Sequence, residues 1–172
     1  MTHALHRGWL RITALVIGSF GPVFFLGTMA KTAEPARLTL DLLSWPIDGA
    51  TTYAHADTRF LSALTGGFLF GWGVMVWFLA QRVYDLAPEA VRRAVLAGLC
   101  AWFVLDSAGS LASGNASNAL FNVFVLALAA GPLWVPVRAA ASPAGSSSAP
   151  AAAGIPSVRV PSATHPESEV LS

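Results

Sequence analysis

The sequence predicts an all-α membrane protein in which four transmembrane helices form an antiparallel bundle and an interfacial segment lies in the first outer loop. Of its 172 residues, 55% are hydrophobic and only 11% are charged, whereas about 25% are charged in ordinary soluble domains. A bilayer span needs about 20 mostly apolar residues. Four stretches meet this requirement, namely residues 12–29, 60–80, 94–112 and 119–137.

The first apolar stretch contains Gly21-Pro22, which predicts a kink because proline removes a backbone hydrogen bond inside a helix. A cleaved signal peptide is the alternative, with Thr28-Met29-Ala30 as its small-residue site. The apolar run is longer than the usual signal-peptide core of about 7–15 residues. We therefore favour a retained span.

The loop between residues 31 and 59 is the longest link between predicted spans. Pro35 is suited to open a helix, and Leu38, Leu42 and Trp45 recur at helical spacing. Leu38, Leu40 and Leu42 also alternate with the polar residues Thr39 and Asp41, so a short strand is the alternative. We favour a helix that lies flat at the membrane interface and ends before Pro46.

The third and fourth spans are separated only by Ser113-Gly114-Asn115, which predicts a tight hairpin. Beyond residue 138 the composition changes to alanine, serine and proline. Such a segment buries too little apolar surface to offset its chain entropy. The predicted organisation is a transmembrane domain over residues 1–138 and a disordered cytoplasmic tail over residues 139–172.

Basic residues predict the orientation, because cytoplasmic loops are enriched in lysine and arginine. One side of the predicted bundle carries Arg7, Arg11, Arg82, Arg92, Arg93, Arg138 and Arg159, and the other carries Lys31, Arg37 and Arg59. Both termini are therefore predicted to be cytoplasmic. The alanine-rich composition indicates a bacterial source, and hence an inner-membrane location.

Small residues in the second span recur every four positions at Ala63, Gly67 and Gly71. Such a ridge lets another helix approach closely. Ser62 and Gly66 form a parallel small ridge beside it. We expect packing within the bundle, with dimerisation as the alternative.

Asp106 is the residue that most needs an explanation, because a carboxylate inside a span is costly unless it finds partners. Ser110 lies one turn further along the same face, and Asn118 and Asn122 share a face of the next helix. These side chains are expected to form a polar cluster across the hairpin.

Arg59 opens the second span on the same predicted side of the membrane, just after His55. We therefore predict an ion pair between Arg59 and Asp106. Such a cluster serves either as polar glue between helices or as a site for a proton or a ligand. Interhelical hydrogen bonding is the commoner role, and the sequence is compatible with either role.

No catalytic set, metal site or cofactor motif is visible. All four histidines lie outside the predicted spans, so they predict no bis-histidine haem between helices. The net charge of +1 excludes a basic nucleic-acid surface. The expected partners are membrane lipids and either another membrane protein or a second copy of this chain.

The stretch "TRFLSALTGGFLFGWG" at residues 58–73 resembles the start of the second span in small, BphX-like four-helix bacterial membrane proteins. The matching residues are Arg59 and the pair Gly66-Gly67, together with Gly21-Pro22 and Arg92-Arg93. The resemblance implies a four-helix fold and a membrane location. It implies no activity.

These observations give three functional hypotheses. The first is a non-enzymatic accessory or scaffold protein that acts through helix–helix contacts. The second is a small carrier or binding protein for a proton or a hydrophobic ligand, with its polar pocket around Asp106 and Arg59. A membrane enzyme acting on a lipid or quinone ranks last, because no catalytic constellation accompanies it.

Overall fold

The computed structural model describes residues 2–137. This part of the chain contains α1 (His3–Leu26), α2 (Glu34–Ser44), α3 (Ala56–Phe78), α4 (Pro88–Ala112) and α5 (Ala116–Ala130). A π-helical turn, η1 (Leu79–Val83), continues α3, and a 3-10 turn, η2 (Gly131–Trp134), continues α5. Arg138 and the predicted tail with Arg159 lie outside the described residues.

The all-α prediction is confirmed for the described residues, which contain no strand. Four helical segments are long and apolar enough to cross a membrane: His3–Leu26, Ala56–Val83, Pro88–Ala112 and Ala116–Trp134, each with a mean hydropathy of 1.6. The chain is therefore consistent with a multi-pass membrane protein. The strand alternative in the first long loop is wrong, since Glu34–Ser44 is helical.

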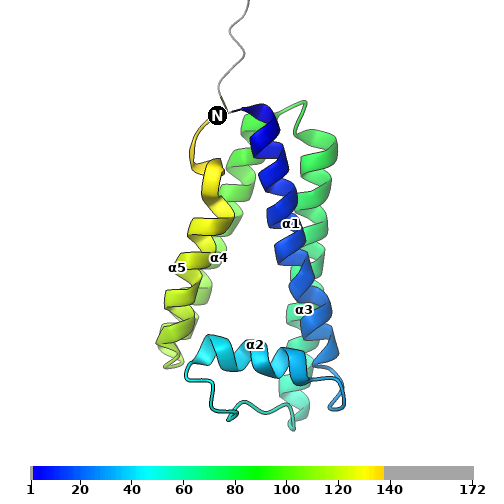
Figure 1. The fold of residues 1–172 in the computed structure, drawn as a ribbon, viewed down its shortest axis with the longest axis vertical. Coiled ribbons are helices and arrows are strands. Elements are labelled where there is room, and N and C mark those ends of the chain that lie inside the picture. Colours follow the sequence, from blue (N-terminus) through cyan, green and yellow to red (C-terminus); the bar gives the residue numbers. More distant parts are fainter. Residues whose placement is uncertain (1, 138–172) are drawn as a thin grey trace, which may run out of the picture. The chain divides into compact units, whose positions relative to one another are not determined.

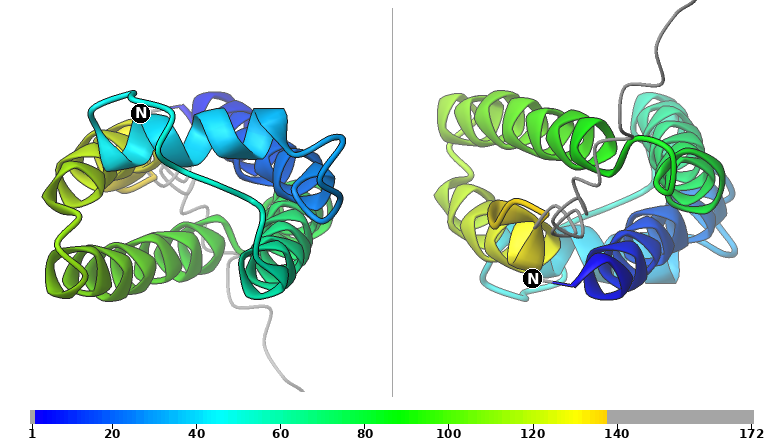
Figure 2. Two further views of the ribbon diagram at one scale, coloured as in Figure 1. Left: turned by 90° about the horizontal axis from the view of Figure 1, so that it is seen from below. Right: turned by 90° about the horizontal axis from the view of Figure 1, so that it is seen from above.

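The four long helices are arranged as two pairs. Helices α1 and α3 lie side by side, α4 and α5 form a second pair, and α2 lies across one end of both (Figures 1 and 2). We call this the α2 end. The opposite end, where α1 and α4 begin and η2 lies, contains Arg92 and is called the Arg92 end (Figure 1).

Glycines bring α1 and α3 into backbone contact. A Cβ atom on Gly73 would lie 2.6 Å from the Cα atom of Gly18, and one on Gly66 would lie 2.8 Å from the carbonyl oxygen of Gly21. The Ser62 hydroxyl strengthens the contact by donating a 2.6 Å hydrogen bond to the carbonyl of Phe24. The ridge that packs inside the protein is therefore Ser62, Gly66 and Gly73.

The first ridge singled out in the sequence, Ala63, Gly67 and Gly71, faces a different direction. Gly67 and Gly71 are exposed, and no atom lies within 4 Å of a Cβ built on either of them. The parallel ridge of Ser62 and Gly66, which the sequence also marked, is the one on which α1 packs. The sequence did not show which of the two ridges would be used.

At the Arg92 end, the two helix pairs meet in an apolar core. The largest fully buried side chains there are Tyr84, Leu10, Leu99 and Leu133. They come from α1, α4, η2 and the connection after η1, so this core joins both pairs. Moving a leucine-sized side chain from water into a protein core stabilises the fold by about 1.5–3 kcal/mol.

Polar side chains reinforce the same junction by donating to carbonyl groups near the end of α5. Trp9 Nε1 and Thr13 Oγ1 both donate to Ala129, at 3.1 and 3.2 Å. The His6 Nε2 atom donates to Pro132 over 2.8 Å. Arg92 is only 8% exposed and donates to the carbonyl of Leu133 over 2.6 Å while pairing with Glu89.

Helix α2 links the pairs at the opposite end. It packs against α1 and α5, and the Ser117 hydroxyl donates a 2.8 Å hydrogen bond to the carbonyl of Leu43. Ala36 and Asp41 are buried against the protein, whereas Leu38, Leu42 and Trp45 remain between 47% and 64% exposed. The predicted apolar stripe therefore faces away from the helix pairs.

The close approach of α1 and α3 predicts that alanine substitutions at two glycines half a turn apart will affect the free energy of unfolding differently. Gly73→Ala should lower the free energy of unfolding by about 1–3 kcal/mol, because the added methyl group meets the backbone of Gly18. Gly71→Ala adds the same methyl group to open space and should leave stability unchanged or slightly raised. Thermal unfolding in one detergent compares them, and equal losses in both variants would contradict the packing.

Candidate functional site

A cavity of about 680 Å³ lies among the helices, and all five α-helices contribute to its lining. Because the two pairs meet at the Arg92 end and are bridged by α2 at the other, the space between them stays open. Ligand pockets in proteins have volumes of about 300–1,000 Å³ and are mostly apolar with a few polar groups. This cavity has the size and the lining of such a pocket.

The cavity wall is mainly aliphatic and aromatic. Its aromatic residues are Trp9, Phe20, Phe24, Tyr53, Trp72, Trp102 and Phe121. Its polar residues include Asp106, Asn115, Asn118 and Asn122 from the α4–α5 hairpin, and Ser62 and Thr65 from α3. Among the described residues that line the cavity, none is a lysine, arginine or histidine, and Asp106 is the only aspartate or glutamate.

The Asp106 carboxylate is held by the facing helix. Asn122 Nδ2 donates to Asp106 Oδ2 over 2.6 Å, and Asn118 Nδ2 donates to the same oxygen over 3.1 Å. The two amides also donate to Ser107 Oγ and Ser110 Oγ, at 3.2 and 2.7 Å. The structure thus brings together four of the residues singled out in the sequence.

Helical geometry explains why these side chains meet. Asp106 and Ser110 are one turn apart on α4, as Asn118 and Asn122 are on α5. The turn at residues 113–115 reverses the chain with Gly114 at φ +79°, a conformation that glycine adopts without strain. The two polar faces are thereby placed opposite each other.

The hydrogen bonds leave one half of the carboxylate free. Both amide donors act on Oδ2, and no hydrogen bond to Oδ1 occurs within residues 2–137. Asn122 is 3% exposed and Ser110 is 8% exposed, whereas Asp106 is half-buried at the cavity wall. The buried side chains therefore act as a support that orients a more accessible carboxylate.

The predicted ion pair between Arg59 and Asp106 is wrong. Arg59 Nη1 donates instead to the carbonyl groups of Tyr53 and Ala54, at 2.9 and 2.6 Å. Arg59 lies on α3 and Asp106 on α4, and these helices belong to different pairs that the cavity separates. The guanidinium of Arg59 therefore has its hydrogen-bond acceptors in the nearby loop and not in the Asp106 carboxylate.

His55 also lies apart from the cluster. It precedes the first residue of α3, makes no side-chain capping hydrogen bond there and is exposed. The sequence placed His55 and Arg59 near Asp106 because all three were expected at one side of the membrane. A shared depth does not bring residues on separate helix pairs into contact.

Several lining residues were missed in the sequence. Trp102 lies one turn before Asp106 on α4, and this i, i+4 spacing was the available signal. Trp9, near the start of α1, donates to Ala129 and lines the cavity. Among the aromatic residues of α3, only Trp72 lines the cavity, while Phe68 and Phe78 are more than half exposed.

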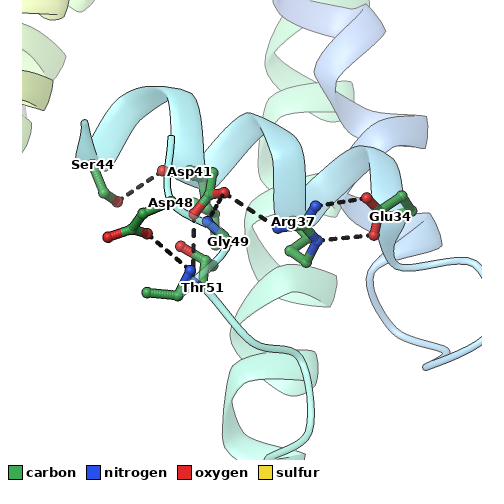
Figure 3. A network of polar contacts seen from close by, with 9 residues as sticks. Glu34, Arg37, Asp41, Ser44, Asp48, Gly49 and Thr51 are labelled. Carbon is green, nitrogen blue, oxygen red and sulfur yellow. Dashed lines mark hydrogen bonds and ion pairs between the residues drawn. The ribbon is translucent and has the colours of Figure 1, made fainter. Parts of the chain in front are cut away.

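At the α2 end, Asp41 is the centre of a second polar network (Figure 3), and its side chain is buried, at 1% exposed. Its Oδ2 atom accepts hydrogen bonds from the Gly49 amide at 2.9 Å and from Arg37 Nη1 at 3.2 Å. The Thr51 amide donates to Oδ1 over 3.4 Å. Asp41 thereby ties the loop after α2 back onto the helix.

Two opposing effects act on the pKa of Asp41. Burial acts to raise it, but hydrogen bonds from Thr51 and Gly49, together with the Arg37 charge, outweigh burial and lower the pKa below 3.8. Glu34 pairs with the same arginine at 2.7 Å, and the hydrogen bond from Arg37 lowers its pKa as well. The network is therefore built around ionised carboxylates.

This network predicts how the loop responds to acid. A lowered folded-state pKa means that Asp41 stabilises the loop above its unfolded value of 3.8 and that this contribution is lost as the pH falls through the lower folded value. The amide signals of Gly49 and Thr51 in a nuclear magnetic resonance titration should move with a midpoint below 3.8. A midpoint above 3.8, or the same titration in Asp41→Asn, would contradict the assignment.

Comparison with known proteins adds no relative to these observations. No protein-family model, no curated protein and no solved structure matches this chain. The resemblance to BphX-like membrane proteins stays a prediction based on Arg59, Gly66-Gly67 and the other short motifs quoted above. The cavity and the polar cluster are therefore the basis on which function is argued.

Proposed function

We propose that this chain is a non-enzymatic integral membrane protein that binds or carries a hydrophobic small molecule in the cavity between its two helix pairs. The observation that carries the proposal is the cavity itself, about 680 Å³ in volume and lined by all five α-helices. A protein whose helices served only as mutual scaffolding would gain stability by closing this space, because unfilled volume costs packing energy.

The lining supports a ligand with a large apolar body. The aliphatic and aromatic wall offers dispersion contacts along most of the cavity. Hydroxyl groups line it on α1, α2 and α3, but its carboxylate and its amide side chains all come from the α4–α5 hairpin around Asp106. Such an arrangement fixes the orientation of a ligand through one polar end. The amides of Asn118 and Asn122 orient the carboxylate of Asp106 in advance.

The proposed setting is a bacterial inner membrane, with the four long helices crossing as an antiparallel bundle. Arg7 and Arg11 lie in the first half of α1, Arg82 in η1, and Arg92 and Arg93 near the start of α4, all toward the Arg92 end. This supports a cytoplasmic position for that end and for both termini. Lys31, Arg37 and Arg59 belong to the other side.

Helix α2 is proposed to lie at the outer membrane interface. Its exposed side chains Leu38, Leu42 and Trp45 form an apolar stripe suited to the boundary between headgroups and acyl chains. On its other side, Leu40 and Leu43 line the cavity. Because α2 covers this end, a ligand dissolved in the bilayer would enter between the helix pairs more readily than a ligand from the outer water.

The proposal predicts that a bulky side chain inside the cavity abolishes occupancy. Thr65 lines the cavity, whereas its neighbour Leu64 does not and is 54% exposed. Protein released from native membranes in mild detergent should carry a bound hydrophobic molecule that native mass spectrometry detects. Thr65→Trp should lose this adduct, and Leu64→Trp should keep it. An unoccupied wild-type protein, or equal occupancy in both variants, would contradict the proposal.

The first hypothesis from the sequence, an accessory protein acting through helix contacts, keeps one supporting observation. Gly67 and Gly71 form an exposed small-residue face on α3 that another helix could approach closely. The partner is then a second copy of this chain or another membrane protein.

This second function predicts an assembly that depends on the glycine face. The double variant Gly67→Leu, Gly71→Leu should dissociate any dimer, and the fold should survive because both positions face open space. Light scattering in detergent gives the mass of the complex. A wild-type protein that is monomeric and free of partners would count against this function.

A further inference from the structure

The carboxylate of Asp106 lacks a cationic partner within the described residues. The ion pairs of residues 2–137 involve other acids, namely Asp85, Glu34, Asp41 and Glu89. The cavity has no basic residue in its lining. A carboxylate inside a membrane span is costly unless a charge or a set of donors compensates it.

The nearest alternatives from the sequence are already engaged. Arg59 donates to the carbonyl groups of Tyr53 and Ala54. Arg92 is committed to Glu89 and to the carbonyl of Leu133 at the Arg92 end. Residues 2–137 therefore supply two neutral amide donors to Oδ2 and no donor to Oδ1.

The aromatic side chains in the same cavity favour a particular kind of counter-ion. Trp102 lies one turn before Asp106 on α4 and is placed to contact a cation there, whereas Trp9 and Trp72 add aromatic wall further toward the Arg92 end. Indole faces attract cations, and the attraction grows when the cation is desolvated. A bare metal ion, by contrast, would find a single carboxylate in a wide, mostly apolar space instead of the six or more oxygen ligands that hard cations take.

We propose that the cavity selects a lipophilic organic cation, whose positive group is seated at Asp106 and whose apolar body fills the aromatic and aliphatic part of the cavity. This inference rests on the proposed binding function and names the class of ligand. The negative charge of the carboxylate pairs with the positive group of the ligand. Asn118 and Asn122 hold the carboxylate in position. Neutral molecules of the same shape gain the dispersion contacts but lose the charge pairing.

The test uses two probes of related shape, tetraphenylphosphonium as the cation and triphenylphosphine oxide as the neutral compound. The full chain is placed in phosphatidylcholine nanodiscs, and equilibrium dialysis against empty nanodiscs gives saturable binding. Wild-type protein should bind the cation at least about tenfold more tightly than the neutral probe. Equal affinities would overturn the inference, and this comparison needs no variant to fold.

Matched variants then locate the charge. Asp106→Asn should weaken binding of the cation about tenfold or more, while binding of the neutral probe stays the same. Asp57→Asn removes the same charge from an exposed position in the first turn of α3, outside the cavity, and should change neither affinity. Retention of cation affinity in Asp106→Asn would overturn the assignment.

The outcomes also separate this inference from the function on which it rests. Saturable binding of the neutral probe without a preference for the cation would leave the cavity as a binding site and reject the cationic ligand class. Absence of saturable binding by either probe, combined with an unoccupied protein from native membranes, would reject both.

Discussion

The carbonyl groups near the end of α5 set the constraint on which the rest of the structure depends. The last carbonyls of a helix have no partner within it, and water cannot satisfy them inside a bilayer. Here Trp9 and Thr13 donate to Ala129 in the last turn of α5, and His6 and Arg92 donate to Pro132 and Leu133 in the 3-10 turn that continues it. The chain ends α5 at Gly131, with φ +29° and the Trp9 ring 2.8 Å from where a Cβ atom would lie, so glycine is required for this contact.

This junction joins the helix pairs at one end only, and the cavity follows from it. Glycine contacts hold α1 against α3, and the amides around Asp106 hold α5 against α4, so each pair has its own internal contacts. Helix α2 bridges them at the other end through α1 and α5. The space between the pairs therefore remains, with Asp106 and its amide partners at its wall.

Much of the fold was predictable from local patterns, whereas the relation between helix pairs was not. Apolar length identified all four long helices, Pro35 indicated α2, and the i, i+4 spacing on both sides of Ser113-Gly114-Asn115 grouped Asp106 with Asn118 and Asn122. The pairing of Arg59 with Asp106 failed because side of the membrane alone does not specify which helices touch. Likewise, periodicity marked a smooth face at Gly67 and Gly71, although α1 packs on Gly66 and Gly73.

The central claim is that a ligand occupies the space between the two helix pairs, with its polar end at Asp106. An experimental structure of the protein in a lipid environment, determined without added ligand after mild extraction, tests this most directly. The account predicts elongated non-protein density between the α1–α3 and α4–α5 pairs that reaches the Asp106 carboxylate. Direct contact between the two pairs along their whole length, with the cavity closed and Asp106 covered by protein, would contradict it.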